Sequence, residues 1–150
     1  MTTDAWLAII HHLAVFGIAA VLAAEWTLVR PGLRATDVRR LVRIDSTYGV
    51  FAAVVLTAGF ARVFLGAKPA SFYTTSSTFW LKIATFAAVG LLSIRPTIRY
   101  LRWRRALTED PESAPAVGEV TAARRAINAQ ITLFASIPIL AALMARGIGA

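Results

Sequence analysis

The chain has 150 residues, 57% of them hydrophobic, and a mean hydropathy of +0.64. A soluble domain carries about 45–50% apolar residues, so this composition indicates that part of the surface faces lipid. The absence of cysteine excludes disulfides, thiolate metal sites and cysteine nucleophiles. The net charge of +8 comes from basic segments that alternate with apolar ones, and no base-stacking motif accompanies them, so we expect no nucleic-acid partner.

Four apolar stretches are each long enough to cross a hydrocarbon core, which needs about 20 residues. In chain order they cover residues 5–29, 45–65, 79–98 and 126–145. The first stretch lacks the basic start and the short apolar run of a cleaved signal peptide, so we expect it to be retained. No period-2 alternation favours a barrel. We therefore predict an all-α membrane protein, an antiparallel bundle of four transmembrane helices in a single domain (residues 1–150), with a flexible acidic linker at 106–120.

Basic residues are concentrated in the first and third connections between these stretches. Twelve of the 16 Lys and Arg residues lie in segments 30–43 and 95–125, whereas the second connection contains only Lys68. The positive-inside rule places the first and third connections in the cytoplasm, with both termini outside. The basic loops are expected to contact anionic lipids, and Tyr100 and Trp103 to anchor the inner interface.

Antiparallel threading places four polar side chains in the outer third of the bundle: His11, His12, Arg62 and Lys82. Asp4 lies outside the first predicted span, so the two cations have no acidic residue at their depth. An external anion would stabilise them, and a haem propionate, an acidic substrate or a lipid phosphate would serve. The alternative is that both cations extend toward lipid headgroups from the helix ends.

Helical phase separates the two histidines by about 100°. His11 shares a face with Glu25 and a stripe of small residues, so we expect it to point into the bundle. His12 is expected to face lipid or another subunit, as in a homo-oligomer. Two readings of His11 stay open: a hydrogen bond to a neighbouring helix, or a metal or haem ligand.

A second polar layer lies at the inner boundary. Glu25 and Asp45 are expected there within reach of several arginines. We predict structural ion pairs that hold the helix ends together, formed by Glu25, Asp45, Arg95 and Arg125.

Short motifs in the first three stretches resemble an uncharacterised family of predicted bacterial inner-membrane proteins, a domain of unknown function. The resemblance covers about residues 5–105 and assigns no activity. It implies a multi-pass protein of the bacterial cytoplasmic (inner) membrane. The segments that carry it are His11-His12-Leu13, Asp45 with Tyr48-Gly49, Gly59 with Arg62-Val63, Phe79-Trp80-Leu81-Lys82, Leu92-Ser93 and Pro96-Thr97.

More remotely, the arrangement is similar to the membrane protoporphyrinogen IX oxidase and copper-resistance protein D families. The oxidases have a histidine early in the first span and a Trp-Leu-x-x-Lys-like element opening the third. Here His11 or His12 and Trp80-Leu81-Lys82 stand in those places, with a shorter Trp-to-Lys spacing and with Glu25 as a further departure. This resemblance implies haem b. With two adjacent histidines, bis-histidine ligation would require a dimer, and one chain would give a five-coordinate haem.

The leading hypothesis is therefore a haem- or tetrapyrrole-binding membrane protein with a redox activity, although the sequence leaves open whether it is an enzyme. His11 would be the iron ligand, and Arg62 and Lys82 would bind propionates. The alternative is a non-enzymatic module for membrane assembly or lipid binding. Copper handling is a weaker alternative, since neither Met1 nor Met144 lies near His11.

Overall fold

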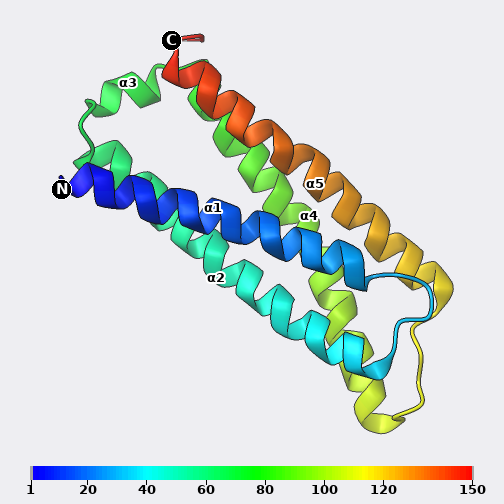
Figure 1. Cartoon of the computed structure of the whole chain (residues 1–150). Helices are drawn as coiled ribbons and strands as arrows, with labels where there is room; N and C mark the ends of the chain where they lie inside the picture. Colours follow the sequence, from blue (N-terminus) through cyan, green and yellow to red (C-terminus); the bar gives the residue numbers. More distant parts are fainter. Residues whose placement is uncertain (1, 150) are drawn as a thin grey trace.

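The computed structural model describes residues 2–149, and within that range every regular element is an α-helix. Four of the helices are long and apolar enough to cross a membrane, as predicted. A short fifth helix lies in the second connection, outside the four predicted spans. The helices are α1 (Thr3–Leu28), α2 (Ala35–Leu65), α3 (Ala70–Thr74), α4 (Ser77–Glu109) and α5 (Val117–Ala145) (Figure 1).

Local signals set where the long helices begin and how they are joined. Thr2 caps α1, its hydroxyl accepting a hydrogen bond of 3.4 Å from the backbone N–H of Ala5. Ser76 caps α4 in the same way, accepting 3.3 Å from the N–H of Phe79. Between α1 and α2 the chain turns at Gly32, whose φ of +80° suits a residue without a Cβ.

Three of the long helices extend by nine or more residues beyond the predicted apolar spans, in each case on the basic side. Helix α2 begins at Ala35, α4 continues to Glu109 and α5 begins at Val117. The connection between α4 and α5 is therefore residues 110–116, shorter than the predicted linker. Hydropathy marks only where a helix meets lipid, whereas the backbone remains helical through the polar residues beyond it.

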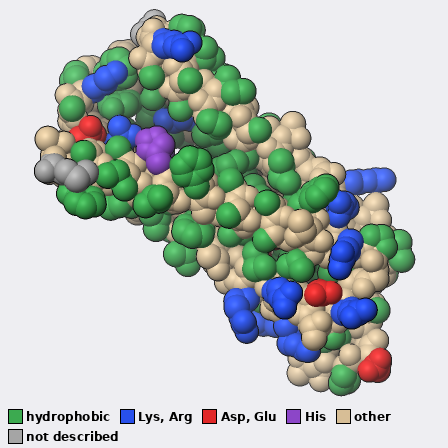
Figure 2. All heavy atoms as spheres, in the orientation of Figure 1, with side chains coloured by type: hydrophobic (Ala, Val, Ile, Leu, Met, Phe, Trp, Pro, Cys, Tyr) green, Lys and Arg blue, Asp and Glu red, His purple; other side chains and the backbone are tan. Residues whose placement is uncertain are grey.

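The four long helices form two antiparallel hairpins, α1 with α2 and α4 with α5. Figure 1 shows the hairpins meeting at the end that carries connections 29–34 and 110–116, which we call the loop end. They separate toward the opposite end, which we call the splayed end and which carries α3, the start of α1 and the end of α5. Basic side chains collect at the loop end (Figure 2). Which end faces the cytoplasm, and whether the chain is one domain, stay predictions.

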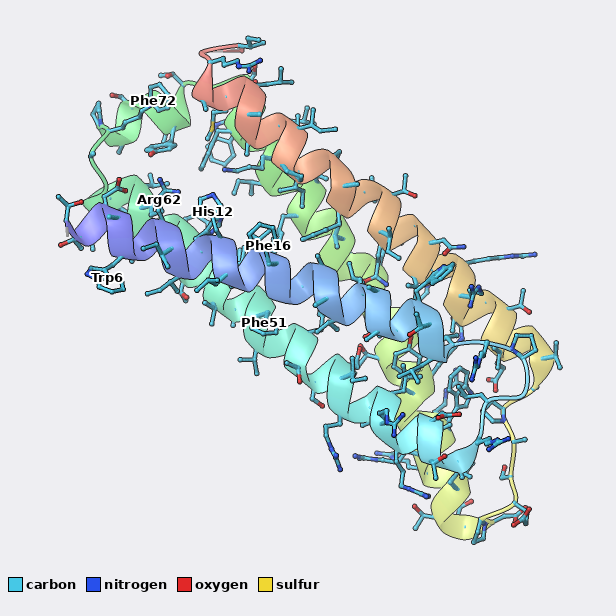
Figure 3. The ribbon with its side chains drawn as sticks, viewed as in Figure 1. Trp6, His12, Phe16, Phe51, Arg62 and Phe72 are labelled. Atoms are coloured by element: carbon cyan, nitrogen blue, oxygen red, sulfur yellow. The ribbon has the colours of Figure 1, made fainter. Side chains whose placement is uncertain are left out.

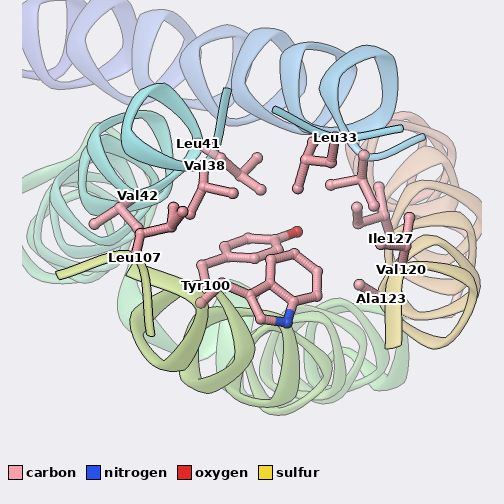
Figure 4. Packing of buried hydrophobic residues seen from close by; sticks show 11 residues of the cluster. Leu33, Val38, Leu41, Val42, Tyr100, Leu107, Val120, Ala123 and Ile127 are labelled. Atoms are coloured by element: carbon pink, nitrogen blue, oxygen red, sulfur yellow. The ribbon is translucent and has the colours of Figure 1, made fainter. Parts of the chain in front are cut away.

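Two clusters of buried side chains hold the hairpins together. The first lies at the loop end and surrounds Tyr100 (Figure 4). The second, farther along the bundle, includes Ile18, Tyr48 and Val89. Large apolar side chains elsewhere face outward, among them Phe64 at 75% exposure and Leu91 at 68%. An exterior of this kind is favourable in lipid, which explains why the apolar composition exceeds what the interior can bury.

Candidate functional site

At the splayed end a cleft of about 60 Å³ lies between the two hairpins. All four long helices contribute to it, and its walls are almost entirely apolar. His11 and Lys82 are the only ionisable residues among those lining it within residues 2–149. The lining residues are His11, Val15, Val55, Leu56, Gly59, Phe60, Val63, Phe79, Lys82, Ile83, Phe86, Phe134 and Ile137.

His11 is held in the cleft by α2. Its Nδ1 lies 3.1 Å from the backbone oxygen of Val55, and because a carbonyl only accepts, Nδ1 carries the proton. Gly59 leaves space for the ring, since a Cβ there would lie 3.2 Å from Cε1 of His11. The predicted hydrogen bond to a neighbouring helix is thus confirmed. It leaves Nε2 with a free lone pair, since Nε2 has no hydrogen-bond partner within residues 2–149.

Lys82 is a cation without a protein counter-charge in the cleft. No Asp or Glu within the described range lies within 4 Å of its Nζ. The nearest aromatic contact is the ring of Phe79, whose centroid lies 5.6 Å from Nζ, close to the limit at which a ring attracts a cation. The expectation of an unpaired cation at this depth therefore holds for Lys82.

For Arg62 the same expectation is wrong. Its Nε lies 3.3 Å from Oδ1 of Asp4, with both side chains 29% exposed. Asp4 was predicted to lie outside the first span because the apolar run starts at Ala5. In the structure α1 already begins at Thr3, so Asp4 lies in its first turn, opposite the last turn of α2. Arg62 therefore supplies no free charge for an external anion.

His12 lines a second hollow, an apolar groove of about 410 Å³ between α1 and α5. Its Nδ1 lies 2.6 Å from the backbone oxygen of Ala8, so Nε2 is free here too. Figure 3 shows His12 and Phe16 projecting from α1 on the side of α4 and α5. Val15 and Phe134 line both hollows, so the groove adjoins the cleft. His12 is exposed at this groove, and whether lipid or a second subunit covers it stays a prediction.

The predicted ion pairs at the inner boundary are not formed. Within residues 2–149 the ion pairs are Asp4–Arg62 and Arg102–Glu119. Arg95 and Arg125 are exposed on outward faces, whereas Glu25 is 2% exposed in the interior. These residues lie at similar depths along their helices, but their side chains point in different directions around the helix axes. The depth of a residue does not give this direction.

Glu25 and Asp45 instead accept hydrogen bonds from uncharged side chains of α4. The hydroxyl of Tyr100 donates to Oε2 of Glu25 over 3.5 Å, and that of Thr97 donates to Oδ1 of Asp45 over 2.8 Å. Sequence reasoning placed Tyr100 at the membrane interface, yet its side chain is fully buried. Its spacing from Pro96 and Trp103, at three to four residues, was the signal that these residues share one inward face.

Arg124 connects the hairpins at the loop end. Its Nη1 donates to the backbone oxygens of Trp26, at 3.0 Å, and Val29, at 2.6 Å. Its guanidinium also lies 4.5 Å above the ring of Trp26. The last carbonyls of α1 lack helical partners, so a cation there satisfies them and complements the helix dipole.

The described residues contain no group of three or more His, Cys, Asp or Glu side chains that could hold a metal ion. A metal held by several ligands of one chain, as copper handling would require, thus finds no preformed site in residues 2–149. A tetrapyrrole iron needs only an axial ligand from the protein, and one free imidazole nitrogen can supply it.

A family model described as "Predicted membrane protein (DUF2214)" matches residues 3–149. No curated protein and no solved structure shows a significant match to the chain.

Proposed function

The chain belongs to the DUF2214 family of predicted membrane proteins, and from its splayed end we propose that it binds haem or a related tetrapyrrole. The observation that carries the proposal is the His11 imidazole. Its Nδ1–H is fixed on the Val55 carbonyl, so Nε2 is left as a free donor to a metal. Metal-ligating histidines usually hold their other ring nitrogen in this way, because the hydrogen bond orients the ring and raises its basicity.

Lys82 supports the same ligand. Its ammonium group lies in the wall of the cleft without an acidic partner among residues 2–149. A propionate carboxylate would accept a charge-assisted hydrogen bond from it. Since Arg62 is neutralised by Asp4, the proposal assigns one propionate contact to Lys82 and none to Arg62.

The volumes of the cleft and the groove limit where a tetrapyrrole could bind. The cleft alone, at about 60 Å³, is too small for a macrocycle, since ligand pockets are typically about 300–1,000 Å³. The adjoining groove, at about 410 Å³, is within that range and is apolar apart from His12. A tetrapyrrole would therefore need the space of groove and cleft together, and His11 would hold its iron. When bound, it would supply one-electron chemistry, while the protein would bind and orient it and exclude water.

Absorption spectra test the proposal. The protein is purified in mild detergent, haem is added, and spectra are recorded oxidised and reduced. We expect a Soret band shifted from that of free haem, and we expect His11→Gln to abolish the shift. Lys82→Gln should weaken binding roughly tenfold to a hundredfold, because a hydrogen bond to a charged group contributes about 1.5–3 kcal/mol.

His12→Gln is the matched control, since it removes the neighbouring imidazole and leaves His11 in place. It should preserve the shifted band. A wild-type protein that gives no shifted Soret band with added haem refutes the proposal. A band that persists unchanged in His11→Gln refutes the assignment of the ligand.

The groove also favours a second candidate, a non-enzymatic lipid-binding or assembly module. Its apolar walls suit an acyl chain, and Lys82 could hold a lipid phosphate. Native mass spectrometry would then detect a co-purified phospholipid that is lost in Lys82→Gln but kept in His11→Gln. If both variants lose the bound ligand, and the wild type shows the shifted Soret band, the tetrapyrrole is favoured.

A further inference from the structure

Nearer the loop end, the two hairpins enclose a pair of carboxyl groups. Glu25 of α1 is 2% exposed and Asp45 of α2 is half-buried. The two carboxyl groups lie within hydrogen-bonding reach of each other. Apolar side chains lie on both sides along the bundle axis, with the Tyr100 cluster toward the loop end and the Ile18 cluster toward the splayed end.

The pair has few donors. Among the described residues, 2–149, Oε2 of Glu25 receives only the long hydrogen bond of 3.5 Å from Tyr100, and Oε1 has no partner. Asp45 receives one hydrogen bond of 2.8 Å from Thr97. A buried carboxylate is normally stabilised by several donors or by a cation, so two ionised groups would be poorly satisfied here.

No cation within residues 2–149 neutralises either carboxyl group. The other titratable groups that face the pair are Tyr48 of α2 and, from α4, Tyr100, beside which lies Arg99. From α5, Arg124 reaches Trp26, which is next to Glu25 in α1. Its hydrogen bonds go to backbone carbonyls and not to a carboxyl group. Two adjacent carboxylates without a counter-ion cannot both ionise in a medium of low dielectric constant.

A second buried polar group lies at the same level on α5. Gln130 is 1% exposed and belongs to the inward face of that helix, between Ile127 and Phe134. Its Nε2 donor has no partner in the described part of the chain, just as Oε1 of Glu25 has none there. Trp26 donates a hydrogen bond of 2.9 Å to Asn128. Because Trp26 is next to Glu25 and Asn128 is two residues before Gln130, Glu25 and Gln130 lie at a similar height along the bundle. Unpaired polar atoms are rare in protein interiors and often mark functional sites.

We propose that Glu25 and Asp45 form a buried proton-binding site that holds one proton between two carboxyl groups. Glu25 stores the proton as a carboxylic acid, and its O–H donates to the Asp45 carboxylate. In exchange with solvent that O–H bond breaks and an O–H bond forms on Asp45. The proton that leaves the half-exposed Asp45 is replaced by another from water, so that the pair keeps one proton. The Ile18 cluster separates this site from the cleft at the splayed end, so the inference is independent of the proposed function.

Infrared spectroscopy tests the inference on the whole protein in a maltoside detergent, which has no carbonyl group. At pH 7 exposed carboxyl groups are ionised, so an un-ionised carboxyl gives an isolated C=O stretching band. We expect one such band in the wild type, with a shift to lower frequency in D2O. Glu25→Gln should abolish it, because the remaining Asp45 loses the adjacent carboxyl group. Glu109→Gln, which changes an exposed carboxyl group at the end of α4, is the matched control and should leave it unchanged.

Asp45→Asn tests the exit route. Glu25 keeps its proton in this variant, but the band should shift in frequency, and its exchange in D2O should be slower than in the wild type. A wild type without an un-ionised carboxyl band overturns the inference, and this measurement needs no variant to fold. A band that neither Glu25→Gln nor Asp45→Asn alters also overturns it.

Discussion

Helix α1 packs tightly against a side chain of α2 at Gly17. A Cβ on this glycine would lie 2.7 Å from three atoms of the Phe51 ring, Cε1, Cε2 and Cζ, a separation that carbon atoms do not tolerate. Gly17→Ala therefore forces the ring or the helices to move. Overpacking of this kind costs about 1–3 kcal/mol, whereas replacing a helical glycine by alanine gains up to about 1 kcal/mol of helix propensity.

The substitution Gly90→Ala separates the steric cost of the added methyl group from the gain in helix propensity. Gly90 lies inside α4, and a Cβ there would meet nothing within 4 Å. The two substitutions gain the same helix propensity, so the difference between their free energies of unfolding is the overpacking cost. We expect Gly17→Ala to be less stable than Gly90→Ala by about 1–3 kcal/mol.

The assay is unfolding in mixed micelles with increasing mole fraction of a denaturing detergent, followed by circular dichroism. Adding Phe51→Leu to Gly17→Ala should recover part of the loss, because a smaller side chain makes room for the new methyl group. Equal midpoints for Gly17→Ala and Gly90→Ala would refute the close approach of α1 and α2 at Phe51.

Two further predictions concern charges and use the same assay. Arg62→Gln should cost less than about 1 kcal/mol, because the ion pair with Asp4 is partly exposed; a much larger loss would mean that the pair is shielded from solvent. Arg124→Gln should cost about 1–3 kcal/mol, because a charged donor to two carbonyls is lost. The exposed Arg125→Gln should change stability by no more than about 0.5 kcal/mol, and equal losses for both arginines would contradict the role of Arg124.

Part of the candidate site could be predicted from the sequence. Depth follows from residue number along a helix, so His11 and Lys82 were correctly placed near one end of the bundle. The hydrogen bond of His11 to another helix was one of two predicted alternatives. The partner of Arg62 was missed, because the start of α1 at Thr3 depends on a cap at Thr2 and not on hydropathy.

The surroundings of Glu25 show more clearly which contacts could not be predicted from the sequence. Charge counting at the inner boundary predicted ion pairs with Arg95 and Arg125, since several arginines lie at that depth. In the structure those arginines point outward, and Glu25 faces Asp45 and Tyr100. Depth is a one-dimensional property of the chain, whereas a contact also requires that two helices be rotated toward each other.

The sequence by itself determined that this protein is an all-helical membrane protein with four crossings, because hydropathy and helix length depend on residues close together in the chain. Only the tertiary structure decided that the hairpins meet at the loop end and separate around His11 and Lys82. It also decided that two carboxyl groups face each other and that no cation among residues 2–149 pairs with them. Helix rotation and crossing follow from side-chain packing between distant segments, and no local pattern records them.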